Sequence, residues 1–204
     1  MKIQLAIDRL SIKKAKEIAK EAAPYVDIIE VGTALIKEFG MLSVRELKKE
    51  VPDKIILADI KTIDEGAYEF ISAFKNGADI ATVMGAASME TLKACYEVTK
   101  NLGKSMMIDL LEVEDNKIYK LKEFSDAIFC IHAPFDGGEQ TLISRLTDFK
   151  TNFHDINNIA VAGGVNMNTI VEIKKAKVDI VIIGGAITKS SNIEKSAKGF
   201  REML

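Results

Sequence analysis

The sequence has little that would hold a protein together by covalent cross-links. Only two of its 204 residues are cysteines, Cys95 and Cys130, and they do not form a CxxC pair. Two cysteines are too few for a disulfide framework, and sparse cysteine is typical of proteins from a reducing compartment. We therefore expect a cytoplasmic protein whose stability comes from a hydrophobic core.

Proline, net positive charge and long apolar runs are also scarce. Three prolines beside 48% hydrophobic residues exclude collagen-like and disordered chains. A net charge of −2 leaves no basic excess for nucleic acid or an anionic membrane surface. No apolar run approaches the roughly 20 residues that span a bilayer, and the opening residues MKIQLAID have the pattern of a strand rather than of a signal peptide. We expect neither nucleic acid nor a membrane among the partners.

A regular succession of short apolar segments is present instead. Runs rich in β-branched residues occur at residues 3–7, 26–31, 54–60, 79–83, 104–110, 126–132, 158–162 and 179–183. Most are continuously apolar, as is typical of strands buried on both faces. Helical patterns lie between several of them, at residues 11–23, 42–50, 65–76, 88–101 and 169–175.

Eight strands that alternate with helices predict an α/β fold, a compact eight-stranded parallel (β/α)8 TIM barrel that forms a single domain over residues 1–204. The alternative is an open doubly wound sheet, which usually has about five or six strands. The chain has neither GxGxxG after the first strand nor GxxxxGK[ST] anywhere. Neither nucleotide-binding loop therefore supports the open sheet.

Polar residues follow nearly every predicted strand, at the end where TIM barrels carry their active sites. In chain order they are Asp8, Glu30, Asp59, Lys61, Asp64, Asp109, His132, Gly163–Gly164 and Gly184–Gly185. Each has an ordinary alternative, since an aspartate could cap the next helix, His132 could be a hydrogen-bonded core residue, and a glycine pair could be a turn. The whole set is harder to explain in this way, because the same end of nearly every strand is polar.

The combination indicates chemistry on a phosphorylated small molecule. Glu30 lies in an apolar strand, where an unpaired carboxylate is costly, and with Asp59 on the adjacent strand it could hold a divalent ion such as Mg²⁺. Lys61 could stabilise an oxyanion, with a structural ion pair to Asp59 as the alternative. The glycine pairs after the last two strands would let backbone N–H groups approach a phosphate.

These residues also carry a resemblance to a known family. The sequence is similar almost end to end to the 3-hexulose-6-phosphate synthases, which belong to the orotidine-phosphate decarboxylase suprafamily of small barrels. The similarity is carried by His132 and by the segments QLAID (4–8), YVDIIEVGT (25–33), PDKI (52–55), ADIKTID (58–64), GAD (77–79), IDL (108–110), VAGGV (161–165) and GGAI (184–187). The DxKxxD segment is specific to the suprafamily. Glu30 separates the chain from the orotidine-phosphate decarboxylases, whose pattern has a lysine there and which use no metal.

The resemblance implies a reversible aldol reaction, in which D-ribulose 5-phosphate condenses with formaldehyde through a 1,2-enediolate to give D-arabino-hex-3-ulose 6-phosphate. On the family pattern Glu30 and Asp59 hold Mg²⁺, with Mn²⁺ as an alternative metal, and Lys61 stabilises the enediolate. His132 is the first candidate for proton transfer and Asp64 is the second.

The resemblance implies roles for the other polar residues as well. Asp8 and Asp109 would orient hydroxyls and the lysine, and the glycine pairs would hold the 5-phosphate. The family is dimeric, so the resemblance also implies a homodimer with shared active sites, in which Asp64 and Thr33 cross into the neighbouring chain's site.

The main alternative is the sister enzyme 3-keto-L-gulonate 6-phosphate decarboxylase (KGPDC), which forms a similar enediolate by losing CO₂. The pattern of that family has an arginine three residues after the site histidine, another in the strand-eight loop, and a glutamate at the end of the fifth strand. This chain has Phe135, Gly185 and Asp109 at those positions. The synthases, however, usually have H-[TA]-G-x-D-x-Q after the histidine, whereas this chain has HAPFDGGEQ over residues 132–140, with Pro134 in place of the glycine. The loop predicts either an altered substrate preference or neutral variation.

Two further hypotheses have less support from the residues present. A non-catalytic paralogue that binds a sugar phosphate would be expected to lack Lys61, Asp59 or His132, and all three are there. A ribulose-phosphate 3-epimerase would need metal-binding histidines on several strands, and the sequence has two histidines in total.

Overall fold

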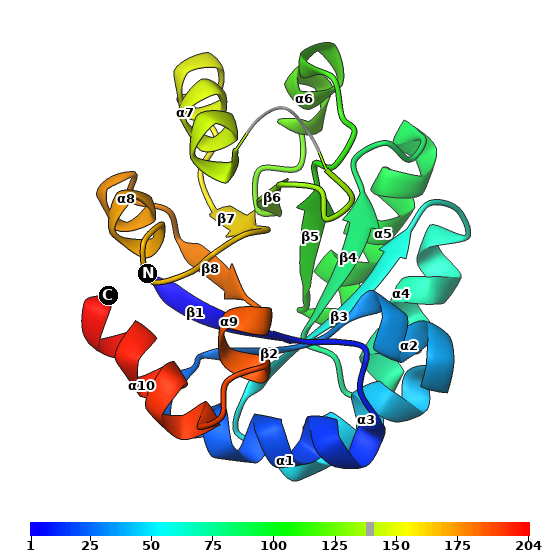
Figure 1. Cartoon of the computed structure of the whole chain (residues 1–204). Coiled ribbons are helices and arrows are strands. Elements are labelled where there is room, and N and C mark those ends of the chain that lie inside the picture. Colours follow the sequence, from blue (N-terminus) through cyan, green and yellow to red (C-terminus); the bar gives the residue numbers. More distant parts are fainter. Residues whose placement is uncertain (138–140) are drawn as a thin grey trace.

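In the computed structural model the eight strands close into one parallel barrel (Figure 1). They are β1 (Lys2–Ile7), β2 (Ile28–Val31), β3 (Ile55–Thr62), β4 (Ile80–Met84), β5 (Ser105–Asp109), β6 (Ile128–His132), β7 (Ile159–Ala162) and β8 (Ile180–Ile183). Each strand pairs with the next in the chain, and β1 pairs with β8 to close the ring. The predicted (β/α)8 barrel is confirmed. The structure describes residues 1–137 and 141–204, so Gly138, Glu139 and Gln140 of the unusual loop lie outside the described residues.

Helices occupy every interval between the strands and surround the barrel (Figure 1). They are α1 (Ile12–Ala22), the 3-10 turn η1 (Ala23–Tyr25), α2 (Thr33–Phe39), α3 (Met41–Glu50), α4 (Gly66–Lys75), α5 (Met89–Leu102), α6 (Asp115–Leu121), α7 (Leu142–Asn152), α8 (Ile170–Lys175), α9 (Gly185–Thr188) and α10 (Ile193–Met203). Within residues 1–137 and 141–204, no helix combines the length and apolar character needed to cross a membrane.

Five of these helices, α2, α6, α7, α9 and α10, were not among the helical patterns found in the sequence. Three of them are short and begin without a side-chain cap, so they leave a weak local signal. The other two do carry a signal, because Thr141 and Asn192 accept backbone N–H bonds at the starts of α7 and α10. Those capping residues could have located both helices.

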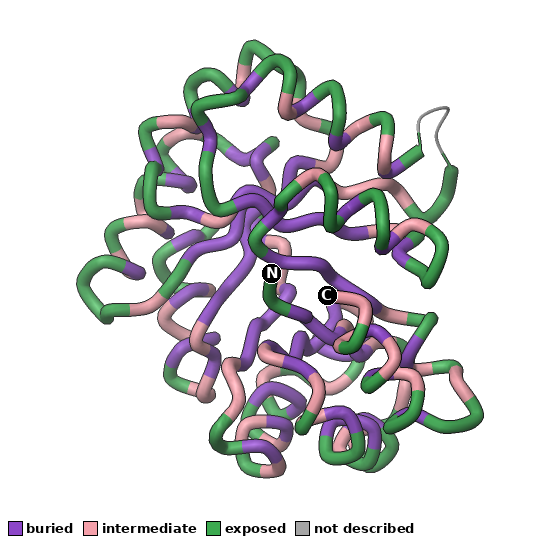
Figure 2. The backbone as a smooth tube through the Cα atoms, turned by 90° about the vertical axis from the view of Figure 1, so that its left-hand side faces the viewer, coloured by how far each residue is buried: buried purple, intermediate pink, exposed green. Residues whose placement is uncertain are grey.

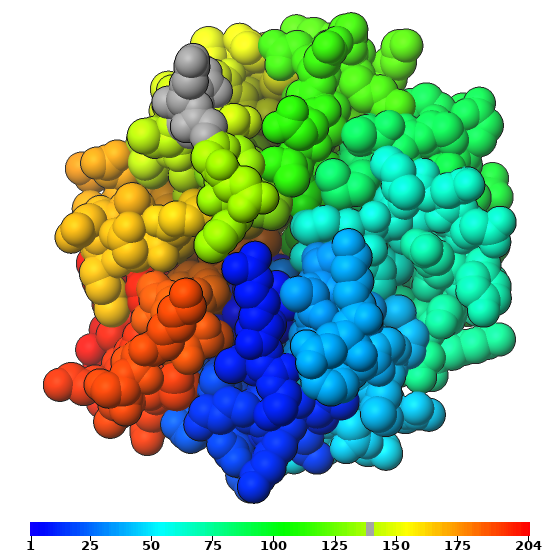
Figure 3. All heavy atoms as spheres, turned by 45° about the vertical axis from the view of Figure 1, so that its right-hand side comes forward, coloured from blue at the N-terminus to red at the C-terminus, as the bar shows by residue number. Residues whose placement is uncertain are grey.

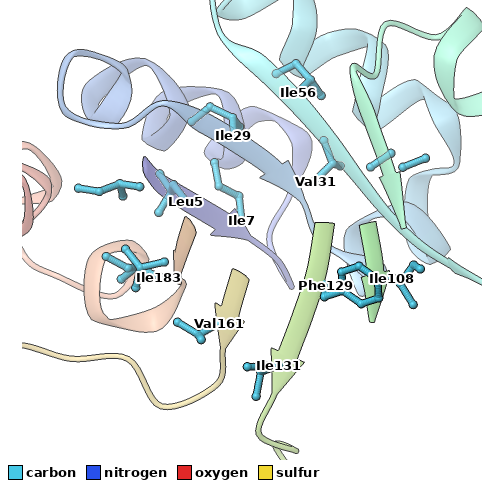
Figure 4. Close-up of a cluster of buried hydrophobic side chains, with 14 of the residues drawn as sticks. Leu5, Ile7, Ile29, Val31, Ile56, Ile108, Phe129, Ile131, Val161 and Ile183 are labelled. Carbon is cyan, nitrogen blue, oxygen red and sulfur yellow. The ribbon is translucent and has the colours of Figure 1, made fainter. Parts of the chain in front are cut away.

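Alternate side chains of each strand point to two separate apolar layers. Leu5, Ile7, Ile29 and Val31 belong to the outer layer, in which strand side chains pack beneath the surrounding helices (Figure 4). A second cluster, drawn from the strands themselves, fills the barrel with Ile28, Leu57, Ile80, Met107, Cys130, Ala160, Ala162, Ile180 and Ile182. The strands are accordingly buried, whereas the exposed residues lie on the helices and loops around them (Figure 2). Because this apolar cluster fills the barrel interior, the polar side chains that point inward gather toward one end of the barrel.

Three aspartates share a structural role at the N-terminal ends of the strands. Each directly precedes a strand and accepts the backbone N–H of a residue in the neighbouring strand. The pairs are Asp27 with Ile3 at 2.7 Å, Asp79 with Ile56 at 3.1 Å and Asp179 with Ile159 at 2.8 Å. These bonds fix the register of adjacent strands where the ladder begins.

Both cysteines are buried as free thiols. Burial raises the pKa of Cys95 to about 12 and raises the pKa of Cys130 well above its usual range. Neither side chain is therefore a thiolate at neutral pH, and Cys130 serves as an apolar member of the barrel interior.

Candidate active site

A cavity of about 700 Å³ opens at the C-terminal ends of the strands, the end turned toward the viewer in Figure 3. Every predicted site residue except Asp64 lines it. These residues are Asp8, Glu30, Thr33, Asp59, Lys61, Asp109, His132, Gly163, Gly164, Gly184 and Gly185. The fold thus brings together side chains that are spread over most of the chain.

Lys61 is the centre of the polar cluster. Its Nζ donates to Asp109 Oδ2 at 2.6 Å and to Asp59 Oδ1 at 3.1 Å. Burial by itself would lower the pKa of Lys61, but the negative charges of Asp59 and Asp109 outweigh burial and hold that pKa above its usual value. The lysine is therefore a fixed positive charge at the base of the cavity.

Asp109 connects this lysine to the site histidine. His132 Nδ1 lies 2.9 Å from the same Oδ2 that accepts from Lys61, and Asp109 Oδ1 accepts the Leu111 backbone N–H at 2.9 Å. Burial would raise the pKa of Asp109, but the hydrogen bond from His132 and the charge of Lys61 lower it to about 2. Because the ionised carboxylate can only accept, the proton of a neutral His132 belongs on Nδ1, and Nε2 is free to take one.

The backbone at Lys61 is locally strained. Its φ is 48°, in the left-handed region that residues other than glycine rarely adopt, and the β3–β4 register shifts between Ala58 and Thr62. Thr82, on β4, supports the distortion, since its Oγ1 accepts the Lys61 N–H at 2.9 Å and donates to Asp59 Oδ1 at 2.9 Å. Strain of this kind is found where a side chain must be aimed at a site. The sequence analysis missed Thr82, which sits inside an apolar strand.

Glu30 is buried with less compensation than the other carboxylates. Gln4, a second residue missed in the sequence, donates from Nε2 to Glu30 Oε2 at 2.6 Å, while the buried Gln4 Oε1 has no partner among the described residues. Burial and then the charge of Asp59 raise the pKa of Glu30 to about 8. Lys61 donates to Asp59 and Asp109 but not to Glu30, so at neutral pH Glu30 holds a proton unless a further positive charge is bound beside it.

A divalent cation would supply positive charge beside Glu30. Glu30 and Asp59 offer the hard oxygen donors that Mg²⁺ prefers, and such ions are often held by one or two carboxylates together with substrate oxygens and water. In the part of the chain that the structure describes, no three His, Cys, Asp or Glu side chains are grouped as a ready-made metal site. The two carboxylates would therefore leave most of the coordination shell to substrate and water.

Thr33 and Asp64 lie in different surroundings. Thr33 Oγ1 donates to Asp59 Oδ2 of its own chain at 2.6 Å, so this side chain joins the polar cluster of its own cavity. The expectation that Thr33 reaches a neighbouring chain's site stays a prediction. Thr33 is the first residue of α2, which begins directly after Gly32 and contacts β3. Asp64 is exposed and does not line the cavity of its own chain.

Asp8 has a mixed role. Its Oδ1 accepts the backbone N–H of Leu35 at 2.8 Å, so Asp8 caps α2. It does not cap α1, the helix that follows it in the chain, which has Ser11 as its cap. A Cβ at Gly32 would lie 2.6 Å from Asp8 Cγ, and only glycine lets the carboxylate approach so closely. Asp8 still lines the cavity, which leaves it beside any bound ligand.

The two glycine pairs form one side of the cavity rim. Gly163 and Gly164 have φ values of 93° and 70°, a backbone conformation that favours glycine, and a Cβ at Gly163 would collide with the Ala133 carbonyl oxygen. Gly184 and Gly185 open α9, whose first N–H groups have no acceptor within the helix. At these four positions the rim therefore presents backbone to the cavity.

A closed barrel with a lysine–carboxylate cluster at its C-terminal end defines a TIM-barrel enzyme. A model of the orotidine 5'-phosphate decarboxylase / HUMPS family matches residues 1–200, and the chain belongs to this family.

Individual relatives are similar over the full length. The 3-hexulose-6-phosphate synthase of Mycobacterium gastri is 36% identical over 217 residues, which cover 100% of both chains. A solved structure of a 3-hexulose-6-phosphate synthase has a TM-score of 0.93 and 35% identity, again with 100% of both chains covered. The KGPDC of Streptococcus mutans, solved as a complex with a ligand, has a TM-score of 0.92 and 25% identity, with 99% of this chain and 96% of that chain covered. The resemblance to the synthases is confirmed, and so is the expectation of an enzyme with lyase-type relatives.

Proposed function

We propose that this chain catalyses the reversible aldol condensation of D-ribulose 5-phosphate with formaldehyde, giving D-arabino-hex-3-ulose 6-phosphate through a 1,2-enediolate. The observation that carries the proposal is the linked set of Lys61, Asp109 and His132 at the base of the cavity. This set joins a fixed positive charge to a group that can move a proton, and enediolate formation needs both.

The first step follows from the tautomer of His132. Its free Nε2 takes a proton from C1 of the ketose, and the electrons of the broken C–H bond form the C1–C2 double bond. The carbonyl electrons move onto the C2 oxygen, where the Lys61 ammonium stabilises the negative charge. Asp109 holds both groups in place and stabilises the imidazolium that forms.

The second step forms the new bond. C1 of the enediolate attacks the carbon of formaldehyde, the C2 carbonyl re-forms, and the oxygen of formaldehyde takes the proton from His132 Nε2. Both steps are reversible, so the same residues serve cleavage of the hexulose phosphate.

Glu30 and Asp59 would hold a divalent cation, Mg²⁺ or Mn²⁺, which when bound supplies further positive charge at the developing oxyanion. The buried, poorly compensated Glu30 carboxylate supports this assignment. On the opposite side, the glycine pairs after β7 and β8 would hold the 5-phosphate through backbone N–H groups.

We also propose that two copies assemble and share their sites. Asp64 lies outside its own cavity, and it has large exposed apolar neighbours in Ile63, 56% exposed, and Tyr68, 72% exposed. An aspartate on such a face is suited to reach a second copy's cavity. The buried free thiols support a cytoplasmic location for the enzyme.

The direct test is to incubate the purified protein with D-ribulose 5-phosphate, Mg²⁺ and formaldehyde, and to follow formaldehyde loss with and without EDTA. We expect fast consumption that EDTA abolishes and that the Lys61→Ala variant lacks. Absence of consumption by the wild-type protein would contradict the proposal. Release of CO₂ from 3-keto-L-gulonate 6-phosphate would then assign the chain to the decarboxylase reaction instead.

A further inference from the structure

A cation stacked on an aromatic ring lies at the mouth of the cavity. The guanidinium carbon of Arg9 is 4.6 Å from the centroid of the Phe135 ring, and both residues line the cavity. Phe135 is 78% exposed, so it is not part of the core. Arg9 lies just after β1 and has a φ of 55°, so the chain turns sharply where its side chain leaves the barrel.

This contact spans one sector of the barrel rim. Arg9 belongs to the loop after β1 and Phe135 to the loop after β6, and in the closed barrel β7 and β8 lie between those two strands. The loops after β7 and β8 carry the two glycine pairs. In Figure 3 the blue segment after β1 meets the yellow-green segment after β6, with the orange segment after β8 beside them. The stacked pair therefore borders the part of the rim at which the two glycine pairs present backbone.

The guanidinium is available for an anion. Among the described residues, Arg9 has no carboxylate partner, and its stacking on Phe135 leaves the edge N–H donors free. Such a planar cation, held by a ring, is suited to bind a phosphate through two parallel hydrogen bonds. The base of the cavity is acidic, so an anionic group is repelled from the base and attracted to the mouth.

We propose that Arg9 binds the phosphate of the substrate at the cavity mouth and that Phe135 is a positioning residue that holds the guanidinium there. The position of Arg9 matters because Gly185, in the loop after β8, brings no charged side chain to this part of the rim. The β1 loop then supplies a side-chain cation for the phosphate. The identity of the substrate as a ketose phosphate rests on the function proposed above, whereas the binding of a phosphate group does not.

The test compares variants of Arg9 in kinetics and in binding. Arg9→Ala is expected to raise KM for D-ribulose 5-phosphate by roughly 10- to 100-fold, the range for loss of a charge-assisted hydrogen bond, with kcat changed less than about threefold. Its affinity for the same sugar phosphate, measured by calorimetry without formaldehyde, should fall by the same factor. Lys13→Ala is the matched control, because Lys13 is an exposed cation of α1 that does not line the cavity. Equal KM and affinity in wild type and Arg9→Ala would overturn the proposal.

The role of Phe135 has its own readout. Phe135→Leu should weaken binding by roughly two- to fivefold, as expected for an exposed cation–π contact, and Phe135→Tyr should restore it. In the Arg9→Ala background, Phe135→Leu should have no further effect, because the ring acts through the guanidinium. Additive losses would overturn the positioning role.

Failure of this proposal can be told apart from failure of the proposed function. A wild-type protein that binds D-ribulose 5-phosphate more tightly than Arg9→Ala but consumes no formaldehyde would support Arg9 and contradict the aldol reaction. Normal turnover by both proteins with the same KM would support the reaction and overturn the role of Arg9.

Discussion

The two ends of the barrel use carboxylates in opposite ways. At the N-terminal end, Asp79 accepts from Lys48 at 3.1 Å and from Lys104 at 2.7 Å, besides a backbone N–H, and it remains partly exposed. At the C-terminal end, the buried Asp59 and Asp109 share the ammonium of Lys61, and the buried Glu30 has no ion pair among the described residues. The carboxylate at the N-terminal end has two lysine partners, whereas the carboxylates at the C-terminal end have fewer positive partners than negative groups.

The difference shows what each end is built for. A half-exposed carboxylate with several donors is fully compensated, so its contribution is to fix strands in register. A buried group of carboxylates with one cation keeps an unfavourable charge balance that a bound metal ion or a developing positive charge can relieve. Substitutions should therefore affect activity at one end and stability at the other.

Lys61→Ala should have the largest effect of all. It removes the ammonium that Asp59 and Asp109 share, and we expect kcat/KM to fall by about 10³-fold or more, since stabilisation of a developing oxyanion is lost. The barrel should still form, because its apolar layers are untouched. Steady-state kinetics and far-UV circular dichroism would check this, and substantial remaining activity would remove the lysine from the mechanism.

Asp109→Asn tests the link between Lys61 and His132. The amide cannot stabilise the imidazolium and can impose the other tautomer, so kcat should fall by roughly 10²- to 10⁴-fold. His132→Ala should cause a similar loss, and the double variant should be little worse than either single one. If the two losses multiplied instead, the residues would act independently.

Glu30→Gln should separate function from stability at the C-terminal end. The amide can keep a contact with Gln4, but it cannot hold a cation well, so we expect the Mg²⁺ concentration for half-maximal rate to rise on the order of 100-fold. Without metal, the variant should be more stable than wild type by about 1–3 kcal/mol at neutral pH, since the buried Glu30 must take up a proton when the chain folds and the amide need not. Unchanged metal dependence would count against the ligand assignment.

Asp79→Ala should give the reverse result. It leaves the Ile56 N–H and two lysines without their acceptor, and we expect a loss of about 1–3 kcal/mol in the free energy of unfolding. The value of kcat/KM should stay within about twofold of wild type, because the site lies at the other end of the barrel. Urea denaturation with a constant m-value would measure the first quantity, and a large loss of activity in the folded variant would break the comparison.

The smallest expected effect is on acid stability. Burial would raise the pKa of Asp79, but the hydrogen bonds from Lys104, Ile56 and Lys48 outweigh it and lower that pKa below its usual value of about 3.9. Because the folded-state pKa is the lower one, this contribution is present above the unfolded-state pKa and is lost as the pH falls through the folded-state pKa. Asp79→Asn should therefore show a shallower loss of stability than wild type below about pH 4. If the free energy of unfolding fell with decreasing pH as steeply in the variant as in wild type, Asp79 would not contribute to acid stability.

The strands and strand-end residues could be predicted because their signals are local. A run of apolar residues followed by Asp8, Asp59 or Asp109 is visible in the sequence, and the barrel places every such end on one rim. Other site residues depend on register between strands. Gln4 and Thr82 lie within apolar runs, and only the pairing of β1 with β2 and of β3 with β4 brings them to Glu30 and Asp59.

Contacts between loops were equally invisible in the sequence. Arg9 and Phe135 are separated by most of the barrel in the chain, and no local pattern predicts that they meet. The same holds for Thr33, whose contact with Asp59 of its own chain depends on how α2 turns after Gly32.

Exchange of the C1 proton of D-ribulose 5-phosphate in D₂O, followed by proton NMR without formaldehyde, tests the central claim most directly. The account predicts that the wild-type protein with Mg²⁺ exchanges one C1 proton for deuterium, that Lys61→Ala and His132→Ala exchange it at least about 100-fold more slowly, and that Asp79→Ala exchanges it at the wild-type rate. No exchange by the wild-type protein, or equal exchange by the Lys61 and His132 variants, would contradict enediolate chemistry at this end of the barrel.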